Sequence, residues 1–175
     1  GILRHAAESE ALARSVPDSN GVYFVPALTG LGAPYWRPEA QGLIAGLTRE
    51  SGAAHIVRAA LEAQAYQTRD LMDAMAADGG QPVQALRADG GLVANQFVCQ
   101  FLADMLGCAV EIPQVAETTA WGAACLAGLQ VGVFEDLPAV ARVWRAHRVY
   151  KPQMTEPERG ALYRGWKRAV EKVLA

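Results

Sequence analysis

A short stretch near the middle of the chain, Asp89-Gly90-Gly91 with Asn95 close behind it, has residue types that could bind a nucleotide. The two glycines lack Cβ atoms, so the turn they form can adopt positive φ and a ligand can lie against the main chain. The amide of Asn95 could hydrogen-bond a base or a ribose. Short glycine motifs also occur in ordinary strand-to-helix turns, so these residues by themselves favour a plain turn.

The segments on either side of this stretch predict a strand and a helix. Residues 83–88 are typical of a short strand, and the residues after Gly91, to about Gly107, are typical of an amphipathic helix. The apolar side of that helix consists of Phe97, Phe101, Leu102 and Leu106. A strand, a tight turn and a helix start bring backbone N–H groups to nucleotides in α/β proteins. We therefore expect unpaired N–H groups and a positive dipole end here.

The rest of the chain predicts alternating strands and helices. Further strands are expected at 22–25, 42–48 and 108–112, and further helices at 52–77 with Ser51 as N-cap, 120–129 with Thr118 or Thr119 as N-cap, 136–146 and 155–175. Gly122 and Gly128 should permit close packing of the third of these helices. The alternation predicts a largely parallel sheet with helices packed on it.

The length fits one domain, residues 1–175, and the composition narrows its class. Residues 1–20 form a helical or turn lead-in, residues 21–130 an α/β body and residues 131–175 C-terminal helices. The hydrophobic fraction is 51% and the formal net charge is −2, without the basic surplus typical of nucleic-acid binding. No apolar run approaches the roughly 20 residues that span a bilayer, and no signal peptide is visible. We expect a cytoplasmic protein that binds neither nucleic acid nor membrane, and the missing initial Met is compatible with a fragment.

The cysteines and histidines predict no metal centre. Cys99, Cys108 and Cys125 are odd in number, and their spacing fits neither a metal knuckle nor a disulfide framework. The three histidines are far apart in the sequence. We expect the cysteines to be small core residues in a reducing compartment.

Two separated segments resemble the C-terminal signature of the FGGY family of sugar and polyol kinases. They are Gly42-Leu43-Ile44-Ala45-Gly46-Leu47 and, after seven residues, His55-Ile56-Val57-Arg58-Ala59-Ala60-Leu61-Glu62. The loop from Pro26 to Trp36 is similar to the members of that family that act on glycerol. Residues 65–70, the 89–95 stretch and residues 118–124 fit the same members, although Trp121 stands where a smaller aliphatic residue is expected. The resemblance extends from Gly21 to Lys172.

The resemblance implies an actin-like (ribonuclease-H-like) ATPase domain, an α/β fold with a mixed sheet and packed helices, of which this chain is a part. It implies that Gly91 contacts the nucleotide through its backbone, that Asn95 lies beside the adenine, and that Gly90 shapes the turn. It also implies ATP or ADP and Mg²⁺ as cofactors of the complete enzyme, glycerol bound through an N-terminal lobe, and a homo-oligomer.

The parts of the family that carry out the chemistry have no counterpart in this sequence. Members are two-lobed, and their phosphate loops and catalytic Asp lie outside the part that this chain resembles. Phosphoryl transfer depends on positioning, charge stabilisation and a base, so we assign no catalytic residue and no metal ligand here, and expect the chain alone to be inactive. A kinase for another polyol or pentose, and a module that binds nucleotide or a partner without catalysis, stay open as alternatives.

Other conspicuous groups have more ordinary interpretations. Tyr35 and Trp36 lie in a loop rich in glycine and proline, and we expect them to pack within it. Arg58 and Glu62 form an i,i+4 pair, and Glu62, Arg69 and Asp70 should lie on an interlobe surface or on plain surface. The basic residues Arg142, Arg145, His147 and Arg148 should form a solvated helix face.

Overall fold

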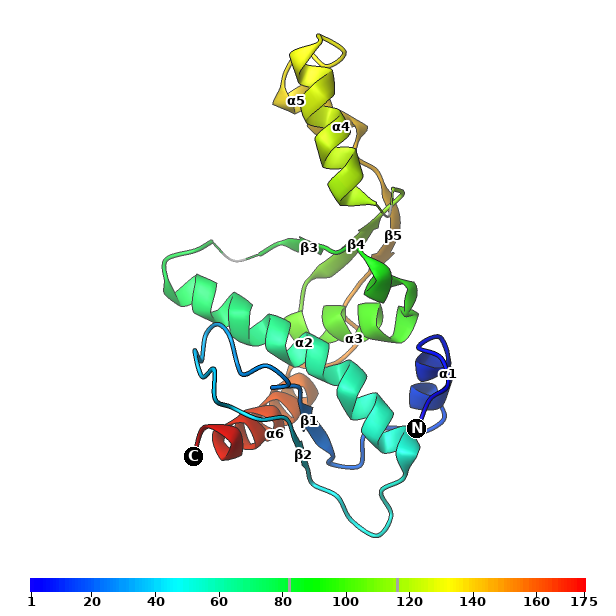
Figure 1. Ribbon diagram of the computed structural model, residues 1–175, viewed down its shortest axis with the longest axis vertical. Helices are drawn as coiled ribbons and strands as arrows, with labels where there is room; N and C mark the ends of the chain where they lie inside the picture. Colours follow the sequence, from blue (N-terminus) through cyan, green and yellow to red (C-terminus); the bar gives the residue numbers. More distant parts are fainter. Residues whose placement is uncertain (82, 116) are drawn as a thin grey trace.

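The longest element is the helix α2 (Ala53–Ala77), and α1, α3 and β1 pack against it in the computed structural model (Figure 1). The structure describes residues 1–81, 83–115 and 117–175. The other elements, in chain order, are α1 (Glu8–Arg14), β1 (Tyr23–Val25), β2 (Leu43–Ala45), β3 (Ala85–Arg87), the 3₁₀ helix η1 (Gly91–Ala94), α3 (Gln96–Leu106), β4 (Ala109–Pro113), α4 (Thr118–Gln130), α5 (Leu137–Val143), β5 (Ala146–Tyr150) and α6 (Glu156–Leu174).

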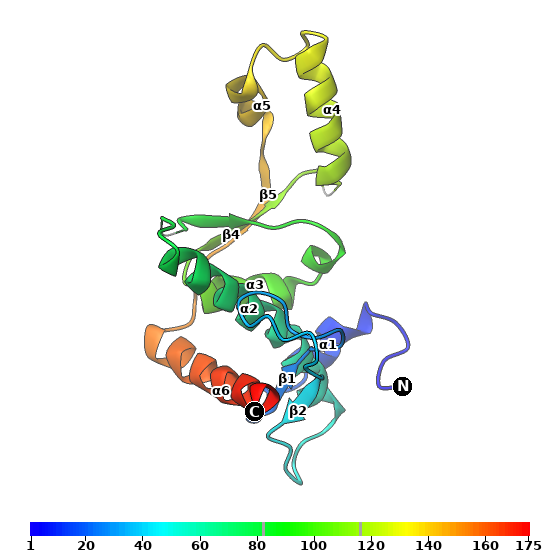
Figure 2. The ribbon, with the colours of Figure 1, turned by 60° about the vertical axis from the view of Figure 1, so that its left-hand side comes forward.

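The strands form two small sheets. β1 and β2 pair antiparallel, with Tyr23 opposite Ala45, and β2 is half-exposed. In the second sheet β4 lies in the middle, parallel to β3 and antiparallel to β5. The mixed sheet is therefore confirmed, and the expectation of a largely parallel sheet is wrong. The chain leaves β4 through α4 and α5 and returns as β5 in the opposite direction (Figure 2).

The region after residue 130 contains a strand as well as helices, which corrects the sequence prediction. α5 ends at Val143, and Ala146–Tyr150 forms β5 where a helix was expected to continue to Ala146. Val149 of β5 lies opposite Glu111 of β4. His147 and Arg148 therefore belong to this strand and not to a helix face. A partner strand so distant in the sequence leaves no local pattern that predicts the pairing.

Aromatic side chains from α2, α3 and α6 fill the main core. Tyr66 stacks on Trp166, with ring centroids 5.3 Å apart, and meets the edge of Phe101 at 5.5 Å. Trp166 is fully buried. Burying a side chain of this size stabilises the fold by about 1.5–3 kcal/mol. A second cluster, in which Cys99 and Ala103 of α3 contact Val110 and Ile112 of β4, fixes α3 on the sheet.

The cysteines occupy the core only in part. Cys99 and Cys125 are buried, as expected, whereas Cys108 is half-buried, and all three are free thiols. Burial raises the pKa of both Cys99 and Cys108. Neither thiol is therefore activated as a nucleophile. Within the described residues, no helix combines the length and the apolar character that crossing a membrane requires.

α4 and α5 project from the ends of β4 and β5 as an arm (Figures 1 and 2). α4 contains no charged residue, and its Leu126 is 67% exposed. Further apolar side chains exposed on the arm are Val131, Val133 and Leu137. A helix that is apolar on all sides is normally enclosed by other structure. Contrary to expectation, the two threonines lie inside this helix, which begins after Glu117.

The two glycines of α4 differ in what surrounds them. A Cβ at Gly128 would lie 2.8 Å from a ring carbon of Phe134, so this glycine permits the close packing that the sequence predicts. A Cβ at Gly122 would have no atom of the described residues within 4 Å. The prediction of close packing is thus confirmed at one end of the helix only.

A buried carboxylate, Asp70 of α2, joins three parts of the chain. It accepts hydrogen bonds from Tyr35 at 2.7 Å, from Nε1 of Trp166 at 2.7 Å and from Tyr163 at 2.5 Å. Nζ of Lys167 lies 3.4 Å away. Asp70 is only 3% exposed, so the prediction that it lies at the surface is wrong.

The loop before β2 is held by this carboxylate through Tyr35, which confirms that the loop is ordered and packed. Trp36 differs from the prediction, because it is 73% exposed and has a φ of +51°. Burial, followed by the neighbouring Asp70, raises the pKa of both Tyr35 and Tyr163 above the ordinary value. Both phenols therefore stay protonated and remain hydrogen-bond donors.

A second buried carboxylate, Glu62, belongs to the same helix and lies nearer its N-terminal end. It pairs with Arg58 at 2.8 Å, which confirms the i,i+4 pair, but at 2% exposure it is also no surface residue. Nη1 of Arg58 donates to the carbonyl of Val16 at 2.7 Å and so ties α2 to the segment before β1. Burial raises the pKa of Glu62, and Arg58 opposes that shift.

Replacing Asp70 by Asn should destabilise the protein strongly. The amide N–H₂ of Asn would face the donors of Tyr35, Tyr163 and Trp166, so we expect a loss of about 3 kcal/mol in the free energy of unfolding. The matched control is Asp73→Asn on the same helix, whose side chain is 60% exposed and which should change stability by less than about 0.5 kcal/mol. Urea unfolding of the intact protein measures both, and equal losses would contradict the role of Asp70.

Candidate functional site

The two glycines of the turn after β3 differ in their backbone conformation and surroundings. Gly90 has a φ of +86°, a conformation that favours glycine, so the turn itself requires this residue. Gly91 has no positive φ, and a Cβ built on it would have no atom of another described residue, beyond its chain neighbours, within 4 Å. The fold therefore does not require glycine at position 91. The bare backbone at Gly91 is exposed and accessible to a ligand.

Asn95 caps α3 instead of lying in its first turn. The 3₁₀ helix η1 stands between the glycine turn and α3, which begins at Gln96. Oδ1 of Asn95 accepts a hydrogen bond from the backbone N–H of Val98 at 3.1 Å, and Nδ2 donates to Oγ of Ser9 at 3.4 Å. A carboxamide carries two N–H bonds, and Ser9 uses one of them. The half-buried side chain thus has a structural role and retains donor capacity.

The start of α3 is covered by α1, contrary to the sequence expectation. Oε2 of Glu10 accepts from the backbone N–H of Gln96 at 2.9 Å, and Asn95 accepts from Val98. These two acceptors take two of the N–H groups that were expected to be unpaired. A carboxylate at a helix N-terminus also neutralises the positive end of its dipole. This helix start is therefore less suited to a phosphate.

A small pocket of about 210 Å³ lies beside the turn, where β3 and β4 end. It is lined by Arg87, Ala88, Asp89, Pro113, Thr118 and Trp144. The carboxyl ends of neighbouring parallel strands are the usual place for ligands in α/β folds. The pocket brings together Asp89 and Thr118, which belong to two segments that fit the family resemblance.

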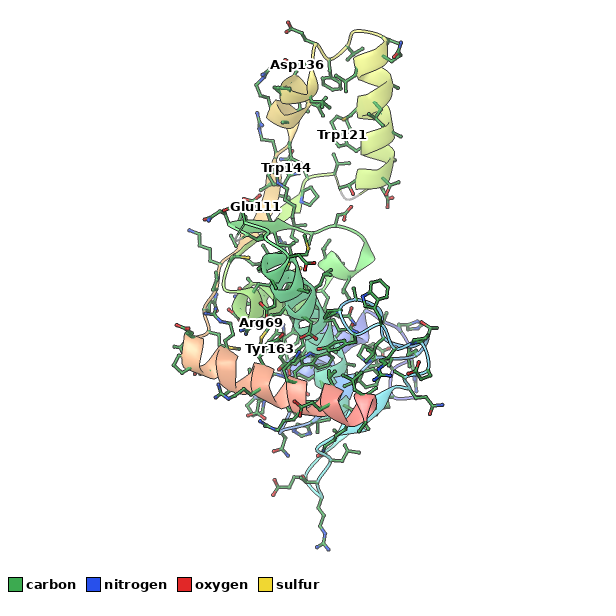
Figure 3. All side chains as sticks on the ribbon, turned by 90° about the vertical axis from the view of Figure 1, so that its left-hand side faces the viewer. Arg69, Glu111, Trp121, Asp136, Trp144 and Tyr163 are labelled. Atoms are coloured by element: carbon green, nitrogen blue, oxygen red, sulfur yellow. The ribbon has the colours of Figure 1, made fainter. Side chains whose placement is uncertain are left out.

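Sequence reasoning missed Trp144 and Arg87 at this pocket. The Arg87 guanidinium lies 3.9 Å from the centroid of the Trp144 ring and pairs with Glu111 at 3.5 Å. Trp144 and Glu111 mark the place where the α4–α5 arm joins the sheet (Figure 3). The juxtaposition arises because β5 returns beside β4, and neither residue has a local sequence signal for it.

The signature residues Gly46 and His55 shape the connection from β2 into α2. Gly46 has a φ of +82°, and Gly52 is the N-cap of α2 where Ser51 was expected. Nδ1 of His55 accepts from the backbone N–H of Gly52 at 3.0 Å, which closes the start of the helix. The described part of the chain contains no group of three or more His, Cys, Asp or Glu side chains that could hold a metal ion.

A match to a protein family covers most of the chain. The C-terminal domain of the FGGY family of carbohydrate kinases matches residues 3–131. Among curated proteins, the chain is 59% identical to a glycerol kinase of Nitrosomonas eutropha over 99% of this chain and 35% of that protein. It is 58% identical to a glycerol kinase of Rhodospirillum rubrum over 98% of this chain and 34% of that protein. The chain thus spans about a third of the length of these relatives.

Solved structures resemble the chain over almost its whole length. The Plasmodium falciparum glycerol kinase with ADP matches it with a TM-score of 0.90 and 34% identity, over 99% of this chain and 35% of that chain. A xylulose kinase of Lactobacillus acidophilus matches with a TM-score of 0.78 and 26% identity, over 94% of this chain and 33% of that chain. The expected fold of an FGGY kinase is confirmed by these matches.

The cap geometry makes a prediction about Asn95 that is independent of any ligand. Asn95→Ala removes the acceptor for the Val98 N–H and should lower the free energy of unfolding by about 1 kcal/mol. Asn95→Ser retains a capping oxygen and should recover most of that loss. Urea unfolding of the three proteins provides the measurement. If the Ala and Ser variants were equally stable, the cap would not contribute as described.

Proposed function

The chain belongs to the FGGY family of carbohydrate kinases, and on that premise we propose that it is the nucleotide-binding part of a cytoplasmic glycerol kinase. The complete enzyme would transfer the γ-phosphoryl group of MgATP to glycerol, giving glycerol 3-phosphate and ADP. The observation that carries the proposal is the identity of 59% over 99% of this chain to a glycerol kinase. The chain is less similar to the L. acidophilus xylulose kinase, at 26% identity.

Within that enzyme, we assign the glycine turn to the adenosine end of the nucleotide. Gly91 would contact the nucleotide through its main chain, and the open space around it supports this role. Asn95 would direct an N–H of its amide towards the base, while Gly90 keeps the turn in shape. Glu10 at the start of α3 supports placing the negatively charged phosphates away from this helix.

The described residues include no group of three or more His, Cys, Asp or Glu side chains that could hold a metal ion. Mg²⁺ in such enzymes binds largely through the phosphates of the nucleotide, so we assign it no ligand from this chain. When bound, MgATP supplies the phosphoryl group and neutralises the charge that develops on it. We propose that the catalytic base and the glycerol contacts belong to the part of the enzyme outside this chain.

The exposed arm of α4 and α5 supports the same interpretation. Leu126, Val131, Val133 and Leu137 are each at least two-thirds exposed here. Such a surface is typical of an interface. Because the relatives are about three times as long as this chain, we propose that further parts of the enzyme cover the arm.

The substrate proposal is tested with the full-length protein and a panel of substrates. We expect MgATP-dependent phosphorylation of glycerol in a coupled assay for ADP, with xylulose and ribulose turned over much more slowly. Efficient phosphorylation of a pentose with little activity on glycerol would favour the alternative of a pentose kinase. If the protein phosphorylated no polyol, the alternative of a module that binds a nucleotide or a partner without catalysis would be favoured.

The nucleotide assignment is tested at Gly91. In the full-length enzyme Gly91→Ala and Gly91→Val should weaken ADP binding in that order, the Val variant by about tenfold or more, because a side chain fills the space between backbone and nucleotide. Gly32→Ala is the matched control, since that glycine also has open space around its Cβ and no positive φ. Calorimetric titration of ADP and a melting curve are recorded for each variant. Unchanged ADP affinity in a folded Gly91→Val protein would return the turn to a purely structural role.

The chain on its own should lack activity and should associate. We expect no glycerol-dependent release of ADP above a heat-treated control, because no carboxylate of this chain is assigned as the base. The exposed apolar arm and the open edges of the sheet favour self-association. Light scattering that showed a monomer with a melting temperature independent of concentration would contradict the second expectation.

A further inference from the structure

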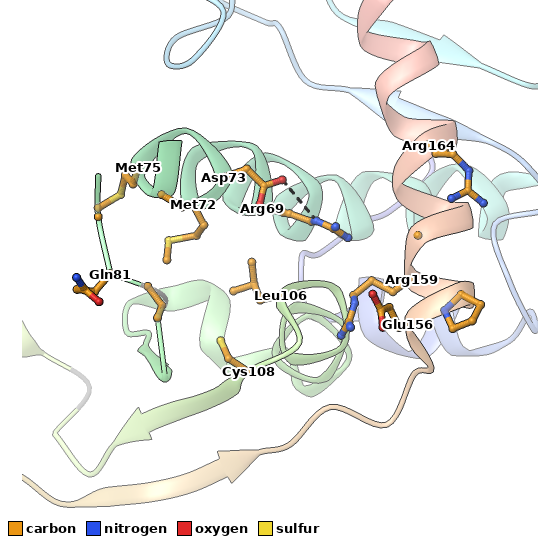
Figure 4. Close-up of a pocket in the computed structure, with 15 residues that line it drawn as sticks. Arg69, Met72, Asp73, Met75, Gln81, Leu106, Cys108, Glu156, Arg159 and Arg164 are labelled. Carbon is orange, nitrogen blue, oxygen red and sulfur yellow. Dashed lines mark ion pairs between the residues drawn. The ribbon is translucent and has the colours of Figure 1, made fainter. Parts of the chain in front are cut away.

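A pocket of about 820 Å³ opens between α2, the end of α3 and the start of α6 (Figure 4). Its volume lies within the range of about 300–1,000 Å³ that is typical of small-molecule sites. The glycine turn does not line it. The two ends of the pocket differ in chemistry. Arginines gather beside α6, and methionines with other apolar side chains occupy the opposite end (Figure 4).

Three arginines form the charged end, and the guanidinium groups of two of them, Arg69 and Arg159, are held by contacts within the fold. Arg69 lies over the ring of Tyr163, 4.0 Å from its centroid (Figure 3). Nη1 of Arg159 donates to the carbonyl of Asp104 at 3.3 Å. Arg164 lies along α6. Such restraint lowers the side-chain entropy that binding a ligand would otherwise cost.

Two glycines make room for these guanidinium groups. A Cβ at Gly107 would collide with the guanidinium of Arg159. Gly107 also has a φ of +70° as the C-cap of α3, so the backbone conformation favours glycine here. A Cβ at Gly160 would approach Nη1 of Arg164 to 3.3 Å. The chain thus leaves space for two arginines at the same pocket wall.

The charges at this end are not balanced. Only two carboxylates, Asp73 and Glu156, line the pocket with the three arginines. Asp73 is 60% exposed, and its ion pair with Arg69 is long, at 3.7 Å. Across residues 1–81, 83–115 and 117–175, neither Arg159 nor Arg164 forms an ion pair. The planar fork of a guanidinium matches the oxygens of a phosphate or carboxylate.

The opposite end of the pocket is apolar and adaptable. It is lined by Met72, Met75, Val83, Leu106 and Cys108. Met75 is 54% exposed and Val83 is 38% exposed, so water covers apolar surface there. Methionine side chains adjust to ligands of different shape. A ligand with an apolar body would remove this surface from water.

We propose that this pocket binds a phosphate monoester whose organic part is apolar. A phosphate monoester presents three terminal oxygens and close to two negative charges, which matches three guanidinium groups better than the two oxygens of a carboxylate. Its organic part would lie between Met72 and Leu106. The proposal does not depend on the assignment of the glycine turn or on the substrate of the kinase.

Phenyl phosphate is a probe with both required parts, titrated calorimetrically into the full-length protein. Saturating ADP is present throughout, so that the nucleotide site is occupied. We expect saturable binding that is tighter than that of inorganic phosphate, phenol or benzoate, and that weakens as the salt concentration rises. If phenyl phosphate failed to saturate, or if phenol or benzoate bound as tightly, the proposal would be wrong.

Variants on α6 locate the site. Arg164→Met keeps an apolar stem, removes the charge, and should weaken the binding of phenyl phosphate about tenfold. Arg159→Met should have a similar effect, although its contact with Asp104 makes a melting curve necessary. Arg168→Met is the matched control, because Arg168 is exposed on the same helix and does not line the pocket. Equal weakening by Arg168→Met would indicate non-specific attraction and would overturn the proposal.

Discussion

The buried carboxylate of Asp70 is the interaction on which the larger part of the fold depends. Its oxygens receive hydrogen bonds from a loop that precedes β2 and from two residues of the last helix. The burial of an ion is costly unless its hydrogen-bonding capacity is filled. Asp70 therefore specifies where the loop and α6 must lie against α2. The aromatic core of Tyr66, Phe101 and Trp166 forms directly beside this point.

The same packing decides what the glycine turn can do. With α3 fixed against α2 and the sheet, α1 reaches the start of α3, where Glu10 accepts from the N–H of Gln96. The start of α3 is thereby less suited to a phosphate. The two glycines then differ in role, since Gly90 is required by its backbone conformation and Gly91 is not.

The arm and the arginine pocket differ in what they expose to water. The arm exposes apolar side chains, and the pocket exposes arginines next to apolar side chains. The arm exposes several large apolar side chains, which fits enclosure by more of the polypeptide. The pocket combines held guanidinium groups with apolar side chains, which fits a small amphipathic ligand. Covering the arm requires only an apolar surface. Filling the pocket also requires a negative charge to compensate its arginines.

The sequence by itself determined the features that depend on neighbouring residues. Helical spacing predicted α2, α3 and α6 to within a few residues, and the glycine pair predicted the turn after β3. The segments at residues 42–62 and 26–36 identified the family correctly. Each of these signals lies within one element or one short stretch of the chain. Local backbone preference and side-chain periodicity are sufficient to produce them.

Only the tertiary structure decided the features whose partners are distant in the sequence. Asp70 is buried because Trp166, 96 residues away, donates to it, and no pattern around Asp70 distinguishes it from an exposed residue. Glu10 reaches Gln96 across 86 residues and so closes a helix start that was expected to be open. The strand β5 exists because β4 pairs with it. In each case the hydrogen-bonding partner comes from another element, so the residue's environment follows from packing and not from its neighbours in the chain.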